Sequence, residues 1–210
     1  MNKVVVLGSN SFSGSHFINY VLENTDAQVI GISRSPEYEP IFLPYLYKKD
    51  RSKRFRFYQL DLNRDIDKII ELCDREKPNI IANYAALSEV RNSWKWPEQC
   101  IETNTVAPIK LASHLIGEDY LQKFLVVSTP EVYGATEDSI KEHRTYAPTT
   151  PYAISKAATD WFFEIIFKKY GFPVIFTRAA NVYGIHQRPY RCIPKTIISL
   201  KKGEKIPLNN

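Results

Sequence analysis

Short runs rich in Val, Ile and Phe alternate along this chain with longer segments in which apolar residues recur at helical spacing. This alternation is typical of βαβ units, in which a helix joins each pair of parallel strands. The expected strands are 3–7, 28–32, 55–59, 79–83, 123–128 and 174–178. The expected helices are 13–23, 64–76, 97–116, 150–170 and 193–202. The pattern predicts an α/β fold with a doubly wound parallel sheet, whose ligands bind beyond the carboxyl ends of the strands.

Length and cysteine content narrow the class of protein. A chain of 210 residues with 44% hydrophobic content can bury the core of one large domain but is short for two. Cys73, Cys100 and Cys192 are odd in number and widely spaced, so we expect neither a disulfide framework nor a metal site. The apolar run after Met1 is too short for a signal peptide or a membrane span. We therefore expect a soluble, cytoplasmic protein without membrane association.

The formal net charge of +5 comes largely from residues 48–56, which hold six basic residues and one acidic residue, with the aromatic Phe55, Phe57 and Tyr58 beside them. Such a mixture can bind single-stranded nucleic acid. A basic run that directly precedes a strand is more often a solvated connection, and we favour that interpretation over a nucleic-acid partner.

A serine-rich loop follows the first expected strand and leads into a helix. Its sequence is Gly8-Ser9-Asn10-Ser11-Phe12-Ser13-Gly14. At this position the pyrophosphate of a dinucleotide contacts backbone amides and the N-terminus of the helix. The alternative is a turn that merely caps the helix. The βαβ context favours cofactor binding, and the residues expected to contribute are Gly8, Asn10, Ser11, Phe12, Ser13 and Gly14.

Further candidate cofactor residues follow the next three strands. After the second strand come Ser33 and Arg34, with no acidic residue that would accept both ribose hydroxyls. Arginine suits a 2′-phosphate, although an exposed arginine at the start of a helix would look the same. The remaining candidates are Asp61 and Leu62 at the adenine edge, and Tyr84, Ala85 and Ala86, where small residues allow close approach. The cofactor is therefore expected to be NAD(P), with NADP preferred over NAD.

The most specific pattern is Tyr152-Ala153-Ile154-Ser155-Lys156 at the start of a helix. Residues four apart project from one helix face, so the ammonium is expected to lower the pKa of the phenol and to orient the nicotinamide ribose. Thr129, at the end of the fifth strand, adds a hydroxyl. With the glycine-containing loop and the strand order, this combination indicates an oxidoreductase.

These features together resemble the extended short-chain dehydrogenases, in the NAD-dependent epimerase/dehydratase family, and most of all its nucleotide-sugar 4,6-dehydratases. The matching segments are 85–88, 103–104, 129–134, 146–152 and 181–184. The resemblance implies a Rossmann-type fold in which Thr129 holds the sugar C4 oxygen, Tyr152 is the base and Lys156 is its partner. It also implies that Thr103 contacts the cofactor, while Ser88, Asn181 and Arg191 contact a nucleotide-sugar substrate.

Glu131 matches the family's base for removal of the C5 proton, after which water leaves from C6 and the hydride returns there. The chain also departs from the family pattern. Ser11 replaces the middle glycine of the loop, and Pro130 stands where some dehydratases carry an acid that protonates the leaving hydroxyl. A C4 epimerase or C6 decarboxylase therefore remains an alternative. A catalytically silent dinucleotide sensor is a further one, which would not need Thr129, Tyr152 or Lys156.

The family's chain continues past the point where this sequence stops, into a smaller lobe over the nucleotide. We therefore expect residues 1–185 to form the NAD(P)-binding domain with the catalytic residues. Residues 186–210 would begin a substrate lobe that is mostly absent. The helix 150–170 is apolar almost all round, and in the family it pairs with its twin, so a homodimer is expected.

Overall fold

The computed structural model describes residues 2–47, 53–135, 139–143 and 145–206. Six strands form one parallel sheet in the order β3-β2-β1-β4-β5-β6, which confirms the doubly wound prediction. The strands are β1 (Lys3–Leu7), β2 (Gln28–Ser33), β3 (Phe55–Gln59), β4 (Ile80–Asn83), β5 (Lys123–Val127) and β6 (Val174–Thr177).

The strand order reverses between β1 and β4. Leu7, the last residue of β1, pairs with Ile32 on one side and with Asn83 on the other, so three strands end at the same level. The connections that leave β1 and β4 turn to opposite sides of the sheet. This leaves a crevice at the carboxyl ends, where doubly wound folds bind their ligands.

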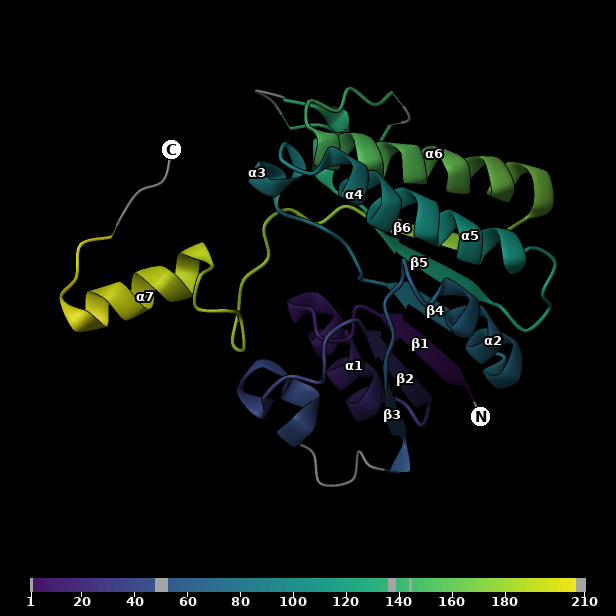
Figure 1. Ribbon diagram of the computed structural model, residues 1–210, viewed down its shortest axis with the longest axis horizontal. Helices are drawn as coiled ribbons and strands as arrows, with labels where there is room; N and C mark the ends of the chain where they lie inside the picture. Colours follow the sequence, from purple (N-terminus) through teal and green to yellow (C-terminus); the bar gives the residue numbers. More distant parts are fainter. Residues whose placement is uncertain (1, 48–52, 136–138, 144, 207–210) are drawn as a thin grey trace.

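One face of the sheet is covered by α2 (Ile66–Glu76), α5 (Ala107–His114) and α6 (Pro151–Tyr170) (Figure 1). Alternate strand residues such as Val5 and Leu7 point to this face, because successive side chains of a strand point to opposite sides. Phe124 of β5 packs on Phe163 of α6, with ring centroids 5.0 Å apart. This contact places α6 against the end of the sheet that carries β5 and β6.

The opposite face of β1 and β2 is covered by α1 (Phe12–Asn24) and by two 3₁₀ turns, Pro40–Phe42 and Pro44–Tyr47. The sequence pattern did not predict these turns, because proline-interrupted segments have no regular period. Leu43 and Tyr45 nevertheless have no exposed surface, and Tyr45 packs on Phe55 of β3. The connection after β2 is thus part of the core.

The helix expected over 97–116 is interrupted. It consists of α4 (Pro97–Ile101), a π-helical turn (Glu102–Val106) and α5, and a short helix, α3 (Val90–Ser93), precedes it. Pro108 in α5 has no N–H to donate to the carbonyl of Asn104 four residues earlier. That carbonyl instead accepts a hydrogen bond from Thr159 Oγ1 of α6 at 2.8 Å. The irregular turn is therefore fixed against α6.

Two arginines of the basic run 48–56 form contacts within the protein. Arg54 donates to the carbonyl of Leu22 near the end of α1, at 2.6 Å, and Arg56 forms an ion pair with Glu76 at 2.8 Å. These contacts favour the structural interpretation over a nucleic-acid site. Lys48, Lys49 and Arg51 lie outside the described residues.

The last helix, α7 (Cys192–Lys202), stands away from the sheet (Figure 1). Its Cys192 is exposed, unlike Cys73 and Cys100. None of the helices in the described ranges is both long and apolar enough to span a membrane.

Candidate active site

A cavity of about 320 Å³ opens at the carboxyl ends of the strands and has the size of a small-ligand site. Most of the residues predicted to bind the cofactor or substrate line it. They are Gly8, Asn10, Ser11, Phe12, Ser33, Arg34, Asp61, Leu62, Tyr84, Ala85, Ala86, Ser88, Thr103 and Arg191. Ser13 and Gly14, in the first turn of α1, are not among the lining residues. Neither are the other predicted binding residues, Thr129, Tyr152, Lys156 and Asn181.

Two glycines allow the loop after β1 to pack closely. Gly8 has φ +79°, and a Cβ on it would lie 2.6 Å from the backbone nitrogen of Ala85 after β4. A Cβ on Gly14 would lie 2.5 Å from the carbonyl oxygen of Gly8. A larger residue at position 8 would push the loop away from the segment after β4, and one at position 14 would push it away from α1. The two glycines of this loop therefore have a steric reason.

Ser11, which departs from the family pattern, is the N-cap of α1. Its side-chain oxygen accepts a hydrogen bond from the backbone N–H of Gly14 at 3.0 Å. This bond satisfies one of the helix's free amide donors, as a capping serine does. The Ser11 side chain therefore fills space that a glycine at this position would leave open. It also takes up the backbone N–H of Gly14, which could otherwise donate to a bound phosphate.

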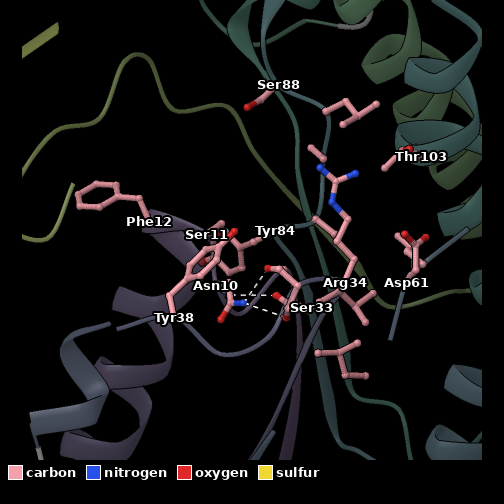
Figure 2. Close-up of a pocket in the computed structure, with 18 of the residues that line it drawn as sticks. Asn10, Ser11, Phe12, Ser33, Arg34, Tyr38, Asp61, Tyr84, Ser88 and Thr103 are labelled. Atoms are coloured by element: carbon pink, nitrogen blue, oxygen red, sulfur yellow. Dashed lines mark hydrogen bonds between the residues drawn. The ribbon is translucent and has the colours of Figure 1, made fainter. Parts of the chain in front are cut away.

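Asn10 joins the loop after β1 to the segment after β2 (Figure 2). Its backbone N–H donates to Ser33 Oγ at 3.0 Å, and its side-chain amide donates to the carbonyls of Ser35 and Pro36. The other side-chain atom, Oδ1, is buried and has no hydrogen-bond partner within the described parts of the chain. An unpaired buried acceptor in a pocket wall suits a ligand hydroxyl, so the residues present fit a dinucleotide.

Arg34 and Asp61 have different roles in the pocket wall. The side chain of Arg34 is exposed and extends within the pocket (Figure 2). The carboxylate of Asp61 accepts hydrogen bonds from the backbone N–H groups of Asn63 and Arg64, so it also holds its own turn. Asn63 in turn donates to Thr103 Oγ1 at 2.8 Å. This bond fixes Thr103 at the pocket, a contact that sequence spacing does not reveal.

The predicted catalytic residues meet where α6 crosses the end of β5. Tyr152, Lys156 and Thr129 are all buried. The ammonium of Lys156 donates to the carbonyl of Val127, the last residue of β5, at 2.8 Å. α6 begins at the N-cap Thr150, whose side chain accepts from the N–H of Ala153, and this cap places Tyr152 in the first turn.

The electrostatics of this pair differ from the expectation. Burial raises the pKa of Tyr152, and a hydrogen bond with Thr129 opposes that rise. Burial lowers the pKa of Lys156 to about 8. The expected lowering of the phenol pKa by the ammonium was wrong for this structure, because desolvation is the larger effect on both groups and Lys156 is bonded to Val127.

Glu131 lies in a 3₁₀ turn, Pro130–Tyr133, directly after β5. Pro130 occupies the first position of the turn, and the backbone N–H of Glu131 donates to Thr129 Oγ1 at 3.3 Å. The residue is exposed, yet partial desolvation of its carboxyl raises its pKa, and its charge in turn acts to raise the pKa of Tyr152. The backbone of Glu131 is thus bonded to the threonine hydroxyl, and the charge of its carboxylate acts on the tyrosine.

The remaining substrate candidates lie further along the chain. Asn181 follows β6 and is exposed, and Arg191 is the N-cap residue of α7 at the pocket wall. Sequence reasoning missed several lining residues, namely Ser35, Tyr38, Leu60, Asn63, Leu87, Gln187, Arg188 and Tyr190. Those next to predicted sites could have been found by extending each strand-end segment. Tyr38 and Arg188 could not, because no local pattern distinguishes them.

Comparison with known proteins adds independent evidence. A family model described as the NAD dependent epimerase/dehydratase family matches residues 4–210. This chain belongs to that family.

The relatives of this family member include both of the activities in the family's name. A human dTDP-D-glucose 4,6-dehydratase is 33% identical over 212 residues, covering 97% of this chain and 57% of that protein. A Streptomyces venezuelae dTDP-glucose 4,6-dehydratase solved with NAD is 27% identical, with a TM-score of 0.82 over 98% of this chain and 64% of that one. A UDP-N-acetylglucosamine 4-epimerase from Methanobrevibacter ruminantium has the same TM-score at 26% identity, over 97% and 64%. The chain thus spans under two thirds of each of these relatives.

Proposed function

We propose that the complete protein is an NAD(P)-dependent nucleotide-sugar 4,6-dehydratase. The observation that carries this proposal is the position of Glu131, whose backbone N–H donates to Thr129 Oγ1 and whose carboxylate, with a raised pKa, acts on the pKa of Tyr152. Dehydration needs a base for the C5 proton besides the pair that oxidises C4, and a carboxylate whose pKa is raised by desolvation suits that role.

In this proposal each residue has one task. Thr129 holds the C4 oxygen and Tyr152 removes the proton of the C4 hydroxyl. Glu131 removes the proton of C5 and passes it to the C6 hydroxyl, which leaves as water. A bound NAD(P), held by the residues that line the cavity at the strand ends, would supply hydride transfer from C4 and back to C6. Lys156, buried and anchored to Val127, supplies positive charge beside the tyrosine.

A C4 epimerase or C6 decarboxylase is the second candidate, and Pro130 favours it. Proline cannot donate a proton to the leaving hydroxyl, and it occupies the first position of the turn between Thr129 and Glu131. A silent dinucleotide sensor is less consistent with the site, since the buried contacts of Tyr152 and Lys156 would have no task in it.

The deciding experiment follows C5 in D₂O with the full-length protein and candidate nucleotide sugars. A dehydratase releases a 4-keto-6-deoxy product with deuterium at C5. Glu131→Gln should lower the rate at which this product forms by about 10²–10⁴-fold, because loss of a general base typically costs that much. Slow reduction of the cofactor should persist. Glu118→Gln, an exposed glutamate after α5, is the matched control. A product that keeps its C6 hydroxyl and carries no deuterium at C5 would contradict the dehydratase proposal and support the epimerase.

We propose that the protein prefers NADP over NAD. Arg34 is the basic residue directly after β2, it lines the pocket, and its side chain is exposed to a ligand. A guanidinium there can form charge-assisted hydrogen bonds with a 2′-phosphate.

We also propose that two copies pair through α6. The side chains of Ile154, Trp161 and Ile165 lie on one side of this helix and are about half exposed or more. Apolar residues spaced by seven and four positions form a continuous stripe on a helix. Pairing with a second α6 would bury this stripe.

We finally propose that residues from 186 onward begin a substrate lobe and that residues 1–185 form the cofactor domain. The position of α7 away from the sheet supports this division. The free thiols of Cys73, Cys100 and Cys192 suit a reducing compartment, consistent with a cytoplasmic protein.

A further inference from the structure

Asp160 lies one helical turn after Lys156 on α6 and has no exposed surface. One of its carboxylate oxygens, Oδ2, accepts hydrogen bonds from Ser128 Oγ and from Arg178 Nη2, each at 2.7 Å. Ser128 follows β5 and Arg178 follows β6. A single carboxylate oxygen therefore joins α6 to the ends of two strands.

The three residues 152, 156 and 160 share one face of α6, since they are four positions apart. They contact three consecutive residues at the end of β5. Tyr152 interacts with Thr129, Lys156 donates to the Val127 carbonyl, and Asp160 accepts from Ser128. The contact of Asp160 therefore joins α6 to the strand end that carries the Thr129 hydroxyl.

Arg178, the partner of Asp160, is itself held by aromatic residues. Its guanidinium lies 5.5, 5.4 and 5.3 Å from the ring centroids of Tyr133, Tyr146 and Phe176, and it also donates to the hydroxyl of Tyr146. Cation–π contacts of this kind restrain a guanidinium. The pair thus has a defined geometry.

The pair is incompletely hydrogen-bonded. Asp160 Oδ1 and Arg178 Nε are buried and have no hydrogen-bond partner among residues in the described ranges. Buried ion pairs with unsatisfied atoms usually contribute little net stability, because desolvation offsets their attraction. A role in geometry and charge explains the pair better than a role in stability.

Charge is the second effect of Asp160 on the site. Burial lowers the pKa of Lys156. The carboxylate of Asp160 opposes that lowering, and Cys100 of α4 does so with a smaller effect. Burial raises the pKa of Asp160 itself, and its contacts with Ser128 and Arg178 oppose that rise. Without the carboxylate, the ammonium would have the carbonyl of Val127 as its hydrogen-bond acceptor but no anion one turn away on its own helix.

We propose that Asp160 is a positioning residue for this active site: together with Arg178 and Ser128 it seats Tyr152 and Lys156 of α6 against Thr129 and places a carboxylate one helical turn from the Lys156 ammonium. This inference rests on the proposed function only for the consequence in turnover. The titration of Lys156 can be measured without any substrate.

The test compares Asp160→Asn with Glu76→Gln in the full-length protein. Glu76 is also a buried, ion-paired carboxylate, but it pairs with Lys3 and Arg56 at the amino ends of the strands, away from the site. The side-chain ammonium groups are labelled with ¹⁵N, the Lys156 signal is assigned by its absence in Lys156→Arg, and its titration is followed by NMR. We expect Lys156 to titrate at lower pH in Asp160→Asn and at the wild-type pH in Glu76→Gln.

Turnover gives the second readout. Asp160→Asn should lower kcat by about 10-fold or more with little change in KM, because small misplacements of reacting groups cost that much. Glu76→Gln should leave kcat unchanged at temperatures below its Tm. A kcat loss that only follows a loss of Tm in both variants would overturn the proposal.

The double variant Asp160→Asn/Arg178→Gln keeps the test valid if the single change leaves Arg178 uncompensated and unfolds the protein. It removes both charges and should restore the fold while retaining the shift in the Lys156 titration. A wild-type Lys156 titration together with a wild-type kcat in this variant would overturn the positioning role. Absence of turnover on every nucleotide sugar in the wild type, with the NMR shift intact, would count against the proposed function and not against the role of Asp160.

Discussion

The guanidinium of Arg188 lies over the ring of Tyr38, with its central carbon 3.9 Å from the ring centroid. The same carbon lies 4.2 Å from the centroid of the Phe42 ring. Arg188 belongs to the segment between β6 and α7, and the two rings belong to the connection after β2. Since Arg188 and Tyr38 both line the pocket, this stacking joins two walls of the proposed cofactor site.

Replacing Arg188 with glutamine should weaken cofactor binding. Cation–π contacts contribute about 0.5–2 kcal/mol, so the Kd of NADPH should rise by about 2–30-fold, mostly through faster dissociation. Stopped-flow fluorescence of the bound nicotinamide measures this rate. Lys201→Gln, which removes a cation of α7 outside the pocket lining, is the control. An unchanged dissociation rate in Arg188→Gln would show that the stacking does not hold the pocket closed.

Arg34→Ala should remove the preference for NADP. A charge-assisted hydrogen bond contributes about 1.5–3 kcal/mol, so the Kd of NADPH should rise by about 10-fold or more while that of NADH changes little. Fluorescence titration with both cofactors measures the two constants. Arg64→Ala changes an exposed arginine that does not line the pocket and should affect neither. Tighter binding of NADH to the wild type, unaltered in Arg34→Ala, contradicts the proposal.

Ile165→Glu should separate the proposed dimer into monomers. The side chain is 60% exposed in the single chain, so the substitution should leave the fold of each copy intact while placing a charge in the apolar stripe of α6. Sedimentation velocity distinguishes the two states. Lys168→Glu alters charge at an exposed polar position of the same helix and should leave the wild-type state unchanged. A wild-type protein that sediments as a monomer would exclude pairing through α6.

The ionisation of Glu76 should make the free energy of unfolding depend on pH in the acid range. The hydrogen bond from Arg56, assisted by Lys3, lowers the pKa of Glu76 from 4.5 to about 2. A carboxyl whose pKa is depressed by folding stabilises the protein above its unfolded pKa, and the contribution disappears as pH falls from about 4.5 to about 2. Glu76→Gln should therefore lower the free energy of unfolding at pH 7 by about 1–3 kcal/mol. The difference from wild type in urea unfolding should shrink below pH 4.5.

Glu71→Gln provides the comparison for that measurement, because Glu71 is an exposed glutamate of the same helix. Its stability should stay within experimental error of wild type from pH 7 to acid. A pH-independent loss in Glu76→Gln would mean that packing of this side chain matters and its charge does not.

The sequence by itself determined the order of strands and helices, the parallel sheet and the positions at which ligand residues occur. Helical and strand periods are local properties, so Lys3–Leu7 and Phe55–Gln59 were predicted at their observed bounds. The rule that doubly wound sheets bind ligands at the carboxyl ends of strands then pointed to Gly8, Ser33 and Tyr84, all of which line the pocket. These inferences needed only neighbouring residues and the chain's order.

Tertiary structure alone decided the rest. Asp160 and Arg178 have no sequence pattern that pairs them, and Arg188 stacks on Tyr38 from a distant segment. The pKa of Tyr152 followed its burial and not its spacing from Lys156, because desolvation depends on every element packed around a group. The π-helical turn likewise depended on Thr159 of another helix, whose hydroxyl donates a hydrogen bond to the carbonyl of Asn104. Such contacts arise only when the folded chain brings distant residues together, and local periodicity carries no information about them.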